Sequence, residues 1–271
     1  MAEAYSLKIF TGTSGWSYEK WKGVFYPDGI RPDKYLEYYS SLYNAVEIDS
    51  TFYNIPDEKT ILKWKKSTPD GFIFCPKMFQ HITHEMKLMG TEKFVDVFAE
   101  RMAALREKLG MILIQLPPSL KFRNKGVIIE FLQGLPSDFK FAIEFRDISW
   151  FNDDIYSLLE KYNITVTWSD TPFVARRYKI TDRNIYLRLV GDRNIKESDF
   201  GKISVDKEKS VDDWTSKMKE MENEFDHAFV FANNHYHGFA PGTINLLRKK
   251  LGMQEIRFPV TSIKKDQKTL F

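Results

Sequence analysis

The chain has 271 residues, of which 43% are hydrophobic and 28% charged, so it carries enough apolar material for one large core. Its 40 basic and 37 acidic residues leave a net charge of +3, and this near balance argues against a protein that coats polyanions nonspecifically. The single cysteine, Cys75, excludes an intrachain disulfide and a cysteine zinc cluster, and the absence of a long apolar run predicts a cytoplasmic protein with no membrane partner.

Short apolar runs that end in polar or charged residues recur along the chain, and each is typical of a strand. In chain order they are residues 8–12, 45–49, 72–76, 111–116, 141–146, 165–169, 185–190 and 228–233. Amphipathic segments separate most of them; residues 91–109, for example, carry an apolar stripe and predict a helix. Pro32 and Pro241 suit first helical positions, and Asn152 and Ser210 suit N-caps.

Eight strand-and-helix units in 271 residues predict an α/β fold in which residues 1–271 form a single (β/α)8 TIM-type barrel domain. The interval between Trp168 and Ile185 contains Pro172 and leaves little room for a helix, so we expect an irregular unit between strands six and seven. A doubly wound open sheet is the alternative fold. It is disfavoured because no glycine-rich phosphate loop follows the first strand.

Charged side chains occupy inward positions near the ends of several predicted strands. Because side chains alternate along a strand, Glu47 and Asp49 share the inward face of one strand, and Glu144 and Arg146 share that of another. In a barrel of this type the loops after the strands build the active site. The sequence therefore predicts acids and cations together at the carboxyl ends of the strands.

Three cations, Lys77, Arg146 and Arg188, come from three different predicted strands. Their convergence favours an anionic ligand such as phosphate, for which Glu47, Glu144 and Lys77 are the candidate acid-base groups. The alternative is that Arg146 forms an ion pair that only neutralises the acids inside the barrel.

Further candidates for substrate binding follow other strands. The aromatic ones would stack on a sugar ring or a splayed base, or would pack as the lid of a long first loop. The substrate-binding candidates, together with Arg146 and Arg188, are Trp16, Asp49, Thr51, Phe52, Tyr53, Gln115, Trp168, Asp170, Asn233, Asn234 and His235.

We predict no cofactor and assign no metal ligand. A divalent metal is the alternative, since the acids together with His235 and His237 offer oxygen and nitrogen ligands. The histidines, however, lack the tight spacing of a zinc motif.

Several of these segments resemble the YecE-like family, also called domain of unknown function 72. The resemblance runs from about residue 8 to residue 251, and it is carried by residues 11–16, 46–53, 72–77, 82–84, 115–118, 142–146 with 149–151, and 231–234. It implies a TIM-barrel-like fold without an established activity. The chain departs from the usual family pattern at three places: Asp49 replaces a common Asn, and Asp147 and Val190 replace common histidines. The loss of two imidazoles leaves Glu47, Glu144 and Lys77 as the better acid-base candidates.

The leading hypothesis is an enzyme, a hydrolase or lyase that acts on a small anionic, phosphate-bearing sugar or nucleotide-like compound. One alternative is a protein that binds single-stranded or damaged nucleic acid without turnover. Another is a metal-dependent sugar isomerase. The sequence does not indicate an oligomeric state.

Overall fold

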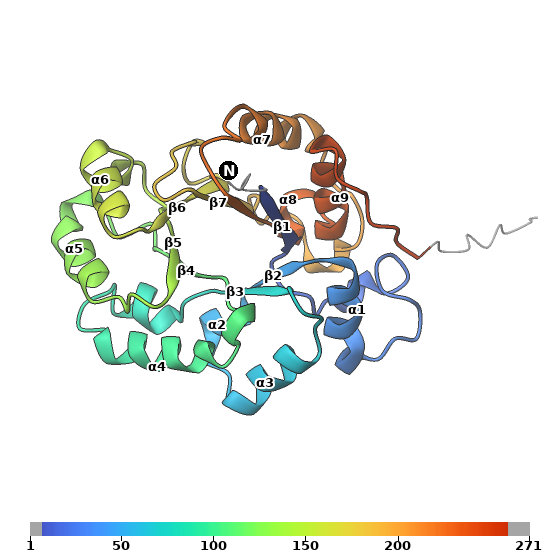
Figure 1. Cartoon of the computed structure of the whole chain (residues 1–271). Coiled ribbons are helices and arrows are strands. Elements are labelled where there is room, and N and C mark those ends of the chain that lie inside the picture. Colours follow the sequence, from blue (N-terminus) through green and yellow to red (C-terminus); the bar gives the residue numbers. More distant parts are fainter. Residues whose placement is uncertain (1–6, 260–271) are drawn as a thin grey trace, which may run out of the picture.

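A computed structural model describes residues 7–259 of the chain. Parallel strands alternate with helices, and Figure 1 shows the helices arranged around the strands. The strands are β1 (Lys8–Thr13), β2 (Ala45–Ile48), β3 (Ile73–Pro76), β4 (Met111–Gln115), β5 (Lys140–Glu144), β6 (Thr165–Asp170), β7 (Asn184–Leu189) and β8 (His227–Ala232). Each run that the sequence assigned to a strand does form one, with small shifts at its ends.

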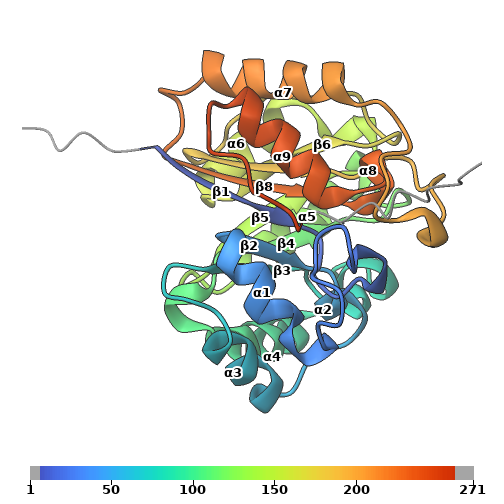
Figure 2. The same ribbon diagram turned by 90° about the vertical axis from the view of Figure 1, so that its right-hand side faces the viewer.

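The helices follow most of the strands. They are α1 (Tyr35–Leu42), α2 (Ser50–Tyr53), α3 (Glu58–Lys66), α4 (Glu92–Ala103), α5 (Lys125–Gln133), α6 (Asp153–Lys161), α7 (Glu208–Glu220), α8 (Asn234–His237) and α9 (Ala240–Lys250). Figure 2 shows α7 and α9 packed side by side on one side of the molecule, with α1, α3 and α4 on the other. None of the helices within residues 7–259 is long and apolar enough to cross a membrane.

Three of the expected helix ends were correct and two were not. Pro32 begins the 3-10 turn Pro32–Lys34, which runs into α1. The side chain of Asn152 caps α6 by accepting a hydrogen bond from the Ile155 amide at 3.2 Å, and Pro241 lies in the first turn of α9. The helix expected over residues 91–109 ends earlier, since Arg106 has a φ of +52° and starts a separate 3-10 turn. Ser210 is not an N-cap because α7 already begins at Glu208. Its hydroxyl donates instead to Asp170 Oδ2 at 2.6 Å.

Six of the strands form one parallel sheet in the order β1-β8-β7-β6-β5-β4, which curls into a half-barrel. Strands β2 and β3 form a separate parallel pair. Isolated hydrogen bonds connect this pair to both edges of the larger sheet. The Gly15 amide donates to the Glu47 carbonyl at one edge, and the Met78 and Gly110 amides donate to the Leu113 and Phe74 carbonyls at the other, each at 2.8 Å. The fold is therefore α/β with a curled parallel sheet. The sequence predicted more than this, namely a barrel in which all eight strands form one closed sheet.

The approach of β1 to β2 depends on Gly12. A Cβ atom at this position would lie 2.0 Å from the carbonyl oxygen of Ala45, so a larger residue would push the two strands apart. This contact helps to bring the end of β2 toward the larger sheet.

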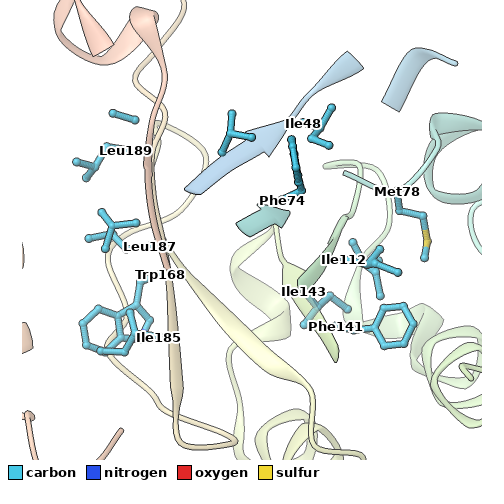
Figure 3. Packing of buried hydrophobic residues seen from close by; sticks show 14 of the residues in the cluster. Ile48, Phe74, Met78, Ile112, Phe141, Ile143, Trp168, Ile185, Leu187 and Leu189 are labelled. Carbon is cyan, nitrogen blue, oxygen red and sulfur yellow. The ribbon is translucent and has the colours of Figure 1, made fainter. Parts of the chain in front are cut away.

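Alternate residues along each strand divide the apolar core into two layers. Side chains on the outer face, such as Phe74, Ile112 and Leu187, pack toward the helices (Figure 3). Those on the other face form a smaller cluster of Phe10, Ala45, Cys75, Met111, Leu113, Ala142, Tyr186, Phe229 and Phe231. Cys75 is fully buried there, and burial raises the pKa of its thiol.

Polar and charged side chains occupy the next positions along the inner face. Since the side-chain period of a strand is two, the residue two positions after an inner apolar residue points to the same side. This gives the pairs Ala45 and Glu47, Cys75 and Lys77, Leu113 and Gln115, Ala142 and Glu144, and Tyr186 and Arg188. A polar layer therefore lies above the apolar one, at the carboxyl ends of the strands.

The connection from β6 to β7 contains no helix within residues 171–183, as the sequence predicted. Asp170 at the end of β6 anchors it. Its Oδ2 atom accepts hydrogen bonds from Arg176 at 2.9 Å, Ser210 at 2.6 Å, Trp214 at 2.9 Å and Tyr236 at 2.9 Å. We call Asp170 and these four donors the Asp170 anchor. It joins the crossover to α7 and α8.

Candidate functional site

The centre of the polar layer is a buried ion pair between Arg188 of β7 and two glutamates. Arg188 Nε and Nη2 donate to the two carboxylate oxygens of Glu47 at 2.8 and 2.7 Å, and Arg188 Nη1 donates to Glu144. The side chains of both glutamates are fully buried, and Arg188 is 3% exposed. Removal of this guanidinium would leave two carboxylates in a site that water does not reach.

Glu47 makes two further hydrogen bonds. The Ser14 hydroxyl donates to Oε1 at 2.7 Å, and the Tyr186 hydroxyl donates to Oε2 at 2.9 Å. Both oxygens therefore have two donors each. This arrangement holds the carboxylate in place and leaves little room for a substrate atom beside it.

Arg146 continues the network toward the surface. Its Nε pairs with Glu144, while Nη1 donates to Thr171 Oγ1 at 3.0 Å and Nη2 donates to Gln115 Oε1 at 3.2 Å. The guanidinium also lies over the ring of Phe173, 5.0 Å from its centroid. Arg146 thus has one ionic partner and two neutral ones.

These contacts decide the charge state of Glu144. Burial alone would raise its pKa, but the positive charges of Arg146 and Arg188 outweigh burial and lower the pKa to about 2. Arg188 is likewise buried, and the charges of Glu144 and Glu47 hold its pKa well above the ordinary value. Glu144 is therefore ionised at neutral pH and does not donate a proton.

Lys77, at the end of β3, differs from the two arginines. Within residues 7–259 its amine has no hydrogen bond or ion pair, and it lies 4.0 Å from the centroid of the Phe52 ring. Lys77 is 6% exposed. Burial lowers the pKa of the amine, whereas Asp49 is the group that most strongly opposes this shift.

Asp49 and His84 complete the edge of the network. Asp49 Oδ1 is buried without a hydrogen-bond partner and lies 3.8 Å from Arg188 Nη2. The His84 ring meets the Phe52 ring edge-on at 4.9 Å, and burial, followed by the charges of Lys77 and Arg146, lowers the pKa of His84 to about 4. We call Lys77, Asp49, His84 and Phe52 the open edge.

The structure brings most of the sequence-predicted site residues together and places the others elsewhere. The structure joins six of them by hydrogen bonds and ion pairs: Glu47, Asp49, Gln115, Glu144, Arg146 and Arg188. Lys77, which lies against Phe52, interacts electrostatically with Asp49, Arg188 and Glu144 of this network. Thr51 supports it, since its hydroxyl lies 2.7 Å from the carbonyls of both Ile48 and Lys77. Tyr53 is 64% exposed and packs edge-on against Phe52.

Two predicted residues lie on the opposite face of their strand. Trp168 stacks on Trp214 of α7 at 6.0 Å, and Asp170 forms the Asp170 anchor with the same helix. They face away from the network because Thr165 and Thr167 occupy the inward positions of β6, and the part of Trp168 and Asp170 in substrate binding stays a prediction.

The residues after β8 have structural contacts. Asn233 caps α8 through the His235 amide, and His235 bonds the Ile195 carbonyl at 2.9 Å. Asn234 is buried and accepts from the Trp21 indole at 3.1 Å. Trp16, which follows β1, also has a structural contact, since it packs edge-on against Trp64 of α3 at 5.5 Å. These contacts hold loops and helices together and connect none of these four residues to the network.

The comparisons with known proteins place this arrangement in a family. Residues 10–268 match the family described as "Protein of unknown function DUF72". The chain belongs to the DUF72 family. Curated relatives are the UPF0759 protein YecE of Escherichia coli, 32% identical over 53% of this chain, and YunF of Bacillus subtilis, 27% identical over 86% of it. The match spans 50% of YecE and 90% of YunF.

Solved structures support the fold. A DUF72 protein from Thermotoga maritima has a TM-score of 0.78 at 26% identity, with 90% of this chain and 99% of that one covered. A DUF72 protein from Enterococcus faecalis has a TM-score of 0.75 at 20% identity, with coverage of 92% and 100%. These relatives confirm the family expected from the sequence and specify no reaction or substrate.

The sequence analysis missed three residues of this DUF72 site. Tyr186 precedes Arg188 by two positions on the inner face, so strand parity could have found it. His84 stood in one of the family segments but was not taken as a site residue. Ser14 carries no local signal, because only tertiary contact between β1 and β2 brings its hydroxyl to Glu47.

A metal site has no support from the ligands. Among the described residues no group of three or more His, Cys, Asp or Glu side chains is arranged to hold a metal ion. The glutamates in the network are engaged by arginines, and His235 bonds a backbone carbonyl.

The main hollows within residues 7–259 are lined by residues other than those of the network. A groove of about 1470 Å³ lies between α1 and α3 and is lined by residues such as Glu37, Lys59 and Lys63. A smaller hollow of about 400 Å³ lies beside Tyr18 and Phe200. We assign function from the chemistry of the network because the larger groove carries no buried charged group.

Proposed function

We propose that this DUF72 protein is an enzyme, a hydrolase or lyase that performs acid-base chemistry on a small anionic, phosphate-bearing sugar or nucleotide-like compound. One observation carries the proposal: in a network where the other buried charges are ion-paired, the Lys77 amine has neither a hydrogen bond nor an ion pair among residues 7–259, and the neighbouring Asp49 Oδ1 has only an ion-pair contact of 3.8 Å to Arg188. Unpaired buried polar groups are costly and cluster at functional sites.

The contacts of the three acid-base candidates, Glu47, Glu144 and Lys77, indicate different roles for them. Lys77 has a lowered pKa and no bonded partner, which suits a group that gives and takes a proton. Glu47 has two donors on each carboxylate oxygen, and Glu144 is held between Arg188 and Arg146. Both glutamates are fully buried, so we assign them the task of positioning Arg188. Asp49 and His84 are the neighbours with which Lys77 would exchange its proton.

Arg146 supports the choice of an anionic substrate. Two of its nitrogens bond the neutral oxygens of Thr171 and Gln115, which a phosphate or carboxylate oxygen could replace with a stronger charge-assisted bond. Lys77 would supply a second cation. Tyr53 and Phe173, 64% and 53% exposed, would flank a ring of the substrate.

We further propose that the two sheets close into one TIM-type barrel domain. The bridges of β1 to β2, through Ser14 and Glu47, and of β3 to β4, through Lys77 and Leu113, support this closure. Three of these four residues, Ser14, Glu47 and Lys77, belong to the site, so closure and function would depend on the same contacts.

Binding of single-stranded nucleic acid without turnover is a second candidate. The exposed rings of Tyr53 and Phe173, the latter under the Arg146 guanidinium, favour it. Salt dependence separates the two, because many phosphate contacts give a steep loss of affinity with salt and a small metabolite does not.

The test is a panel of sugar phosphates and nucleoside monophosphates, each beside its unphosphorylated counterpart. Phosphorylated members are expected to raise the melting temperature, since a ligand at 100 times its Kd adds about 2.7 kcal/mol of stability, and one of them to be consumed when products are followed by NMR. Lys77→Met is expected to abolish turnover, and the exposed Lys93→Met is the matched control. Equal shifts with and without phosphate, or equal activity in Lys77→Met, would refute the proposal.

A further inference from the structure

Lys77 has the surroundings of an amine that reacts with carbonyl groups. Its nitrogen meets no carboxylate within the described residues and lies against an aromatic face instead. Arg188 and Arg146 are held by Glu47 and Glu144, so these acids are not available to lock the lysine in an ion pair. A desolvated amine next to other cations is the usual setting of a nucleophilic lysine.

We propose that Lys77 forms an imine with an aldehyde or ketone substrate. The inference rests on the proposed function and narrows it to carbonyl compounds that also carry a phosphate or carboxylate. Burial, and the charge of Arg188, lower the pKa of the amine and so increase its uncharged fraction.

The step balances in atoms and charge. The Lys77 ammonium first passes a proton to the Asp49 carboxylate or to the neutral His84 ring. The nitrogen lone pair then attacks the carbonyl carbon, and the carbonyl electron pair moves to oxygen, which takes up the proton. The resulting carbinolamine loses its oxygen as water, which carries off a second proton from nitrogen. One ammonium and one carbonyl thereby give one iminium and one water.

The network accommodates this product because the charge at Lys77 does not change. The three carboxylates Glu47, Asp49 and Glu144 balance three cations before and after the reaction. The iminium would also remain over the Phe52 ring, whose face attracts a cation. An iminium withdraws electrons from the adjacent carbon, which is the requirement of a lyase.

The experiment is reductive trapping. The full chain is incubated with sodium cyanoborohydride and with dihydroxyacetone phosphate, pyruvate or neutral dihydroxyacetone, and the modified lysine is identified by peptide mass spectrometry. We expect labelling at Lys77 by the anionic probes, about tenfold faster than at the exposed Lys93, which corresponds to ~1.4 kcal/mol in barrier. Lys77→Arg keeps the charge and is expected to lose this adduct. Lys93→Met is expected to keep it.

The outcomes separate the two proposals. Labelling of surface lysines at the same rate as Lys77, or no adduct at Lys77 in a chain that still binds phosphorylated compounds, overturns the imine and leaves the proposed function standing. Equal labelling by the neutral and anionic probes supports the imine but refutes the proposal that the substrate must carry a phosphate or carboxylate. Failure of both labelling and binding refutes both. A melting curve of Lys77→Arg like that of the unmodified chain shows that a lost adduct is not a lost fold.

Discussion

Two regions of this protein pair a carboxylate with an arginine, one partly exposed and the other fully buried, and their polar groups find partners to different degrees. In the Asp170 anchor one oxygen of Asp170 accepts from Arg176 and from three neutral donors, Ser210, Trp214 and Tyr236. In the inner network Glu47, Glu144, Arg146 and Arg188 are paired, whereas at the open edge the Lys77 amine has no hydrogen bond or ion pair and Asp49 Oδ1 has no hydrogen bond.

The difference indicates which region is built for stability and which for chemistry. The donors of the Asp170 anchor come from the helix-free crossover, α7 and α8, so the cluster stands in for a missing helix. The inner network leaves the Lys77 amine without a hydrogen bond or ion pair and Asp49 Oδ1 without a hydrogen bond, and no structural task within residues 7–259 accounts for the unpaired amine. Satisfied networks rigidify a fold, whereas unsatisfied groups persist where they are used.

The largest expected effect comes from breaking the inner network at its centre. Arg188→Met leaves Glu47 buried without its cation and Glu144 paired only with Arg146, and is expected to cost about 3–5 kcal/mol, measured by urea denaturation. A double variant that adds Glu47→Gln removes the stranded charge and should recover much of this loss. A single variant that loses less than about 1 kcal/mol would show that the acids find other partners.

A smaller loss is expected at the Asp170 anchor. Asp170→Asn keeps the size of the side chain but removes the charge that four donors share, at a cost of about 2 kcal/mol. Hydrogen exchange should show faster opening of residues 171–183, while labelling of Lys77 is unchanged. The control is Asp213→Asn, since Asp213 is half-exposed and pairs with the same Arg176; its cost should stay below about 1 kcal/mol. Loss of Lys77 labelling in Asp170→Asn would contradict the separation of the two regions.

Lys77→Met is expected to separate function from stability. The amine has no ionic partner to leave behind, so the free energy of unfolding should change by less than about 1 kcal/mol, whereas binding of phosphorylated compounds is lost. Calorimetric titration beside a melting curve measures both. A large fall in stability with unchanged binding would make Lys77 a structural partner of Asp49.

The smallest effect is a shift in the pKa of His84. Burial and the charges of Lys77 and Arg146 lower this pKa from 6.5 to about 4, so the unfolded chain binds more protons in that range and stability falls as pH drops from 6.5 toward 4. Lys77→Met removes one of the causes and should raise the pKa of His84. NMR titration of the imidazole, assigned with His84→Gln, measures it. An unchanged pKa would place Lys77 too far away to exchange a proton with His84.

The sequence by itself determined the strands, the family and most of the inner network. Apolar runs located β1 to β8, and the period of two correctly placed Glu47, Glu144 and Arg188 on one face, because alternation is a property of the local backbone. The same rule did not reveal that Trp168 and Asp170 face α7, since the parity of a strand is set by what packs against it.

Tertiary structure alone decided which charges are paired. Glu47 lies 141 residues from Arg188, and no local pattern shows that this arginine holds both glutamates and leaves Lys77 without a partner. The hydroxyl of Ser14 reaches Glu47 only because Gly12 allows β1 to approach β2. Strand positions follow from short-range periodicity, whereas the pairing of buried charges depends on which strand ends meet when the sheet curls.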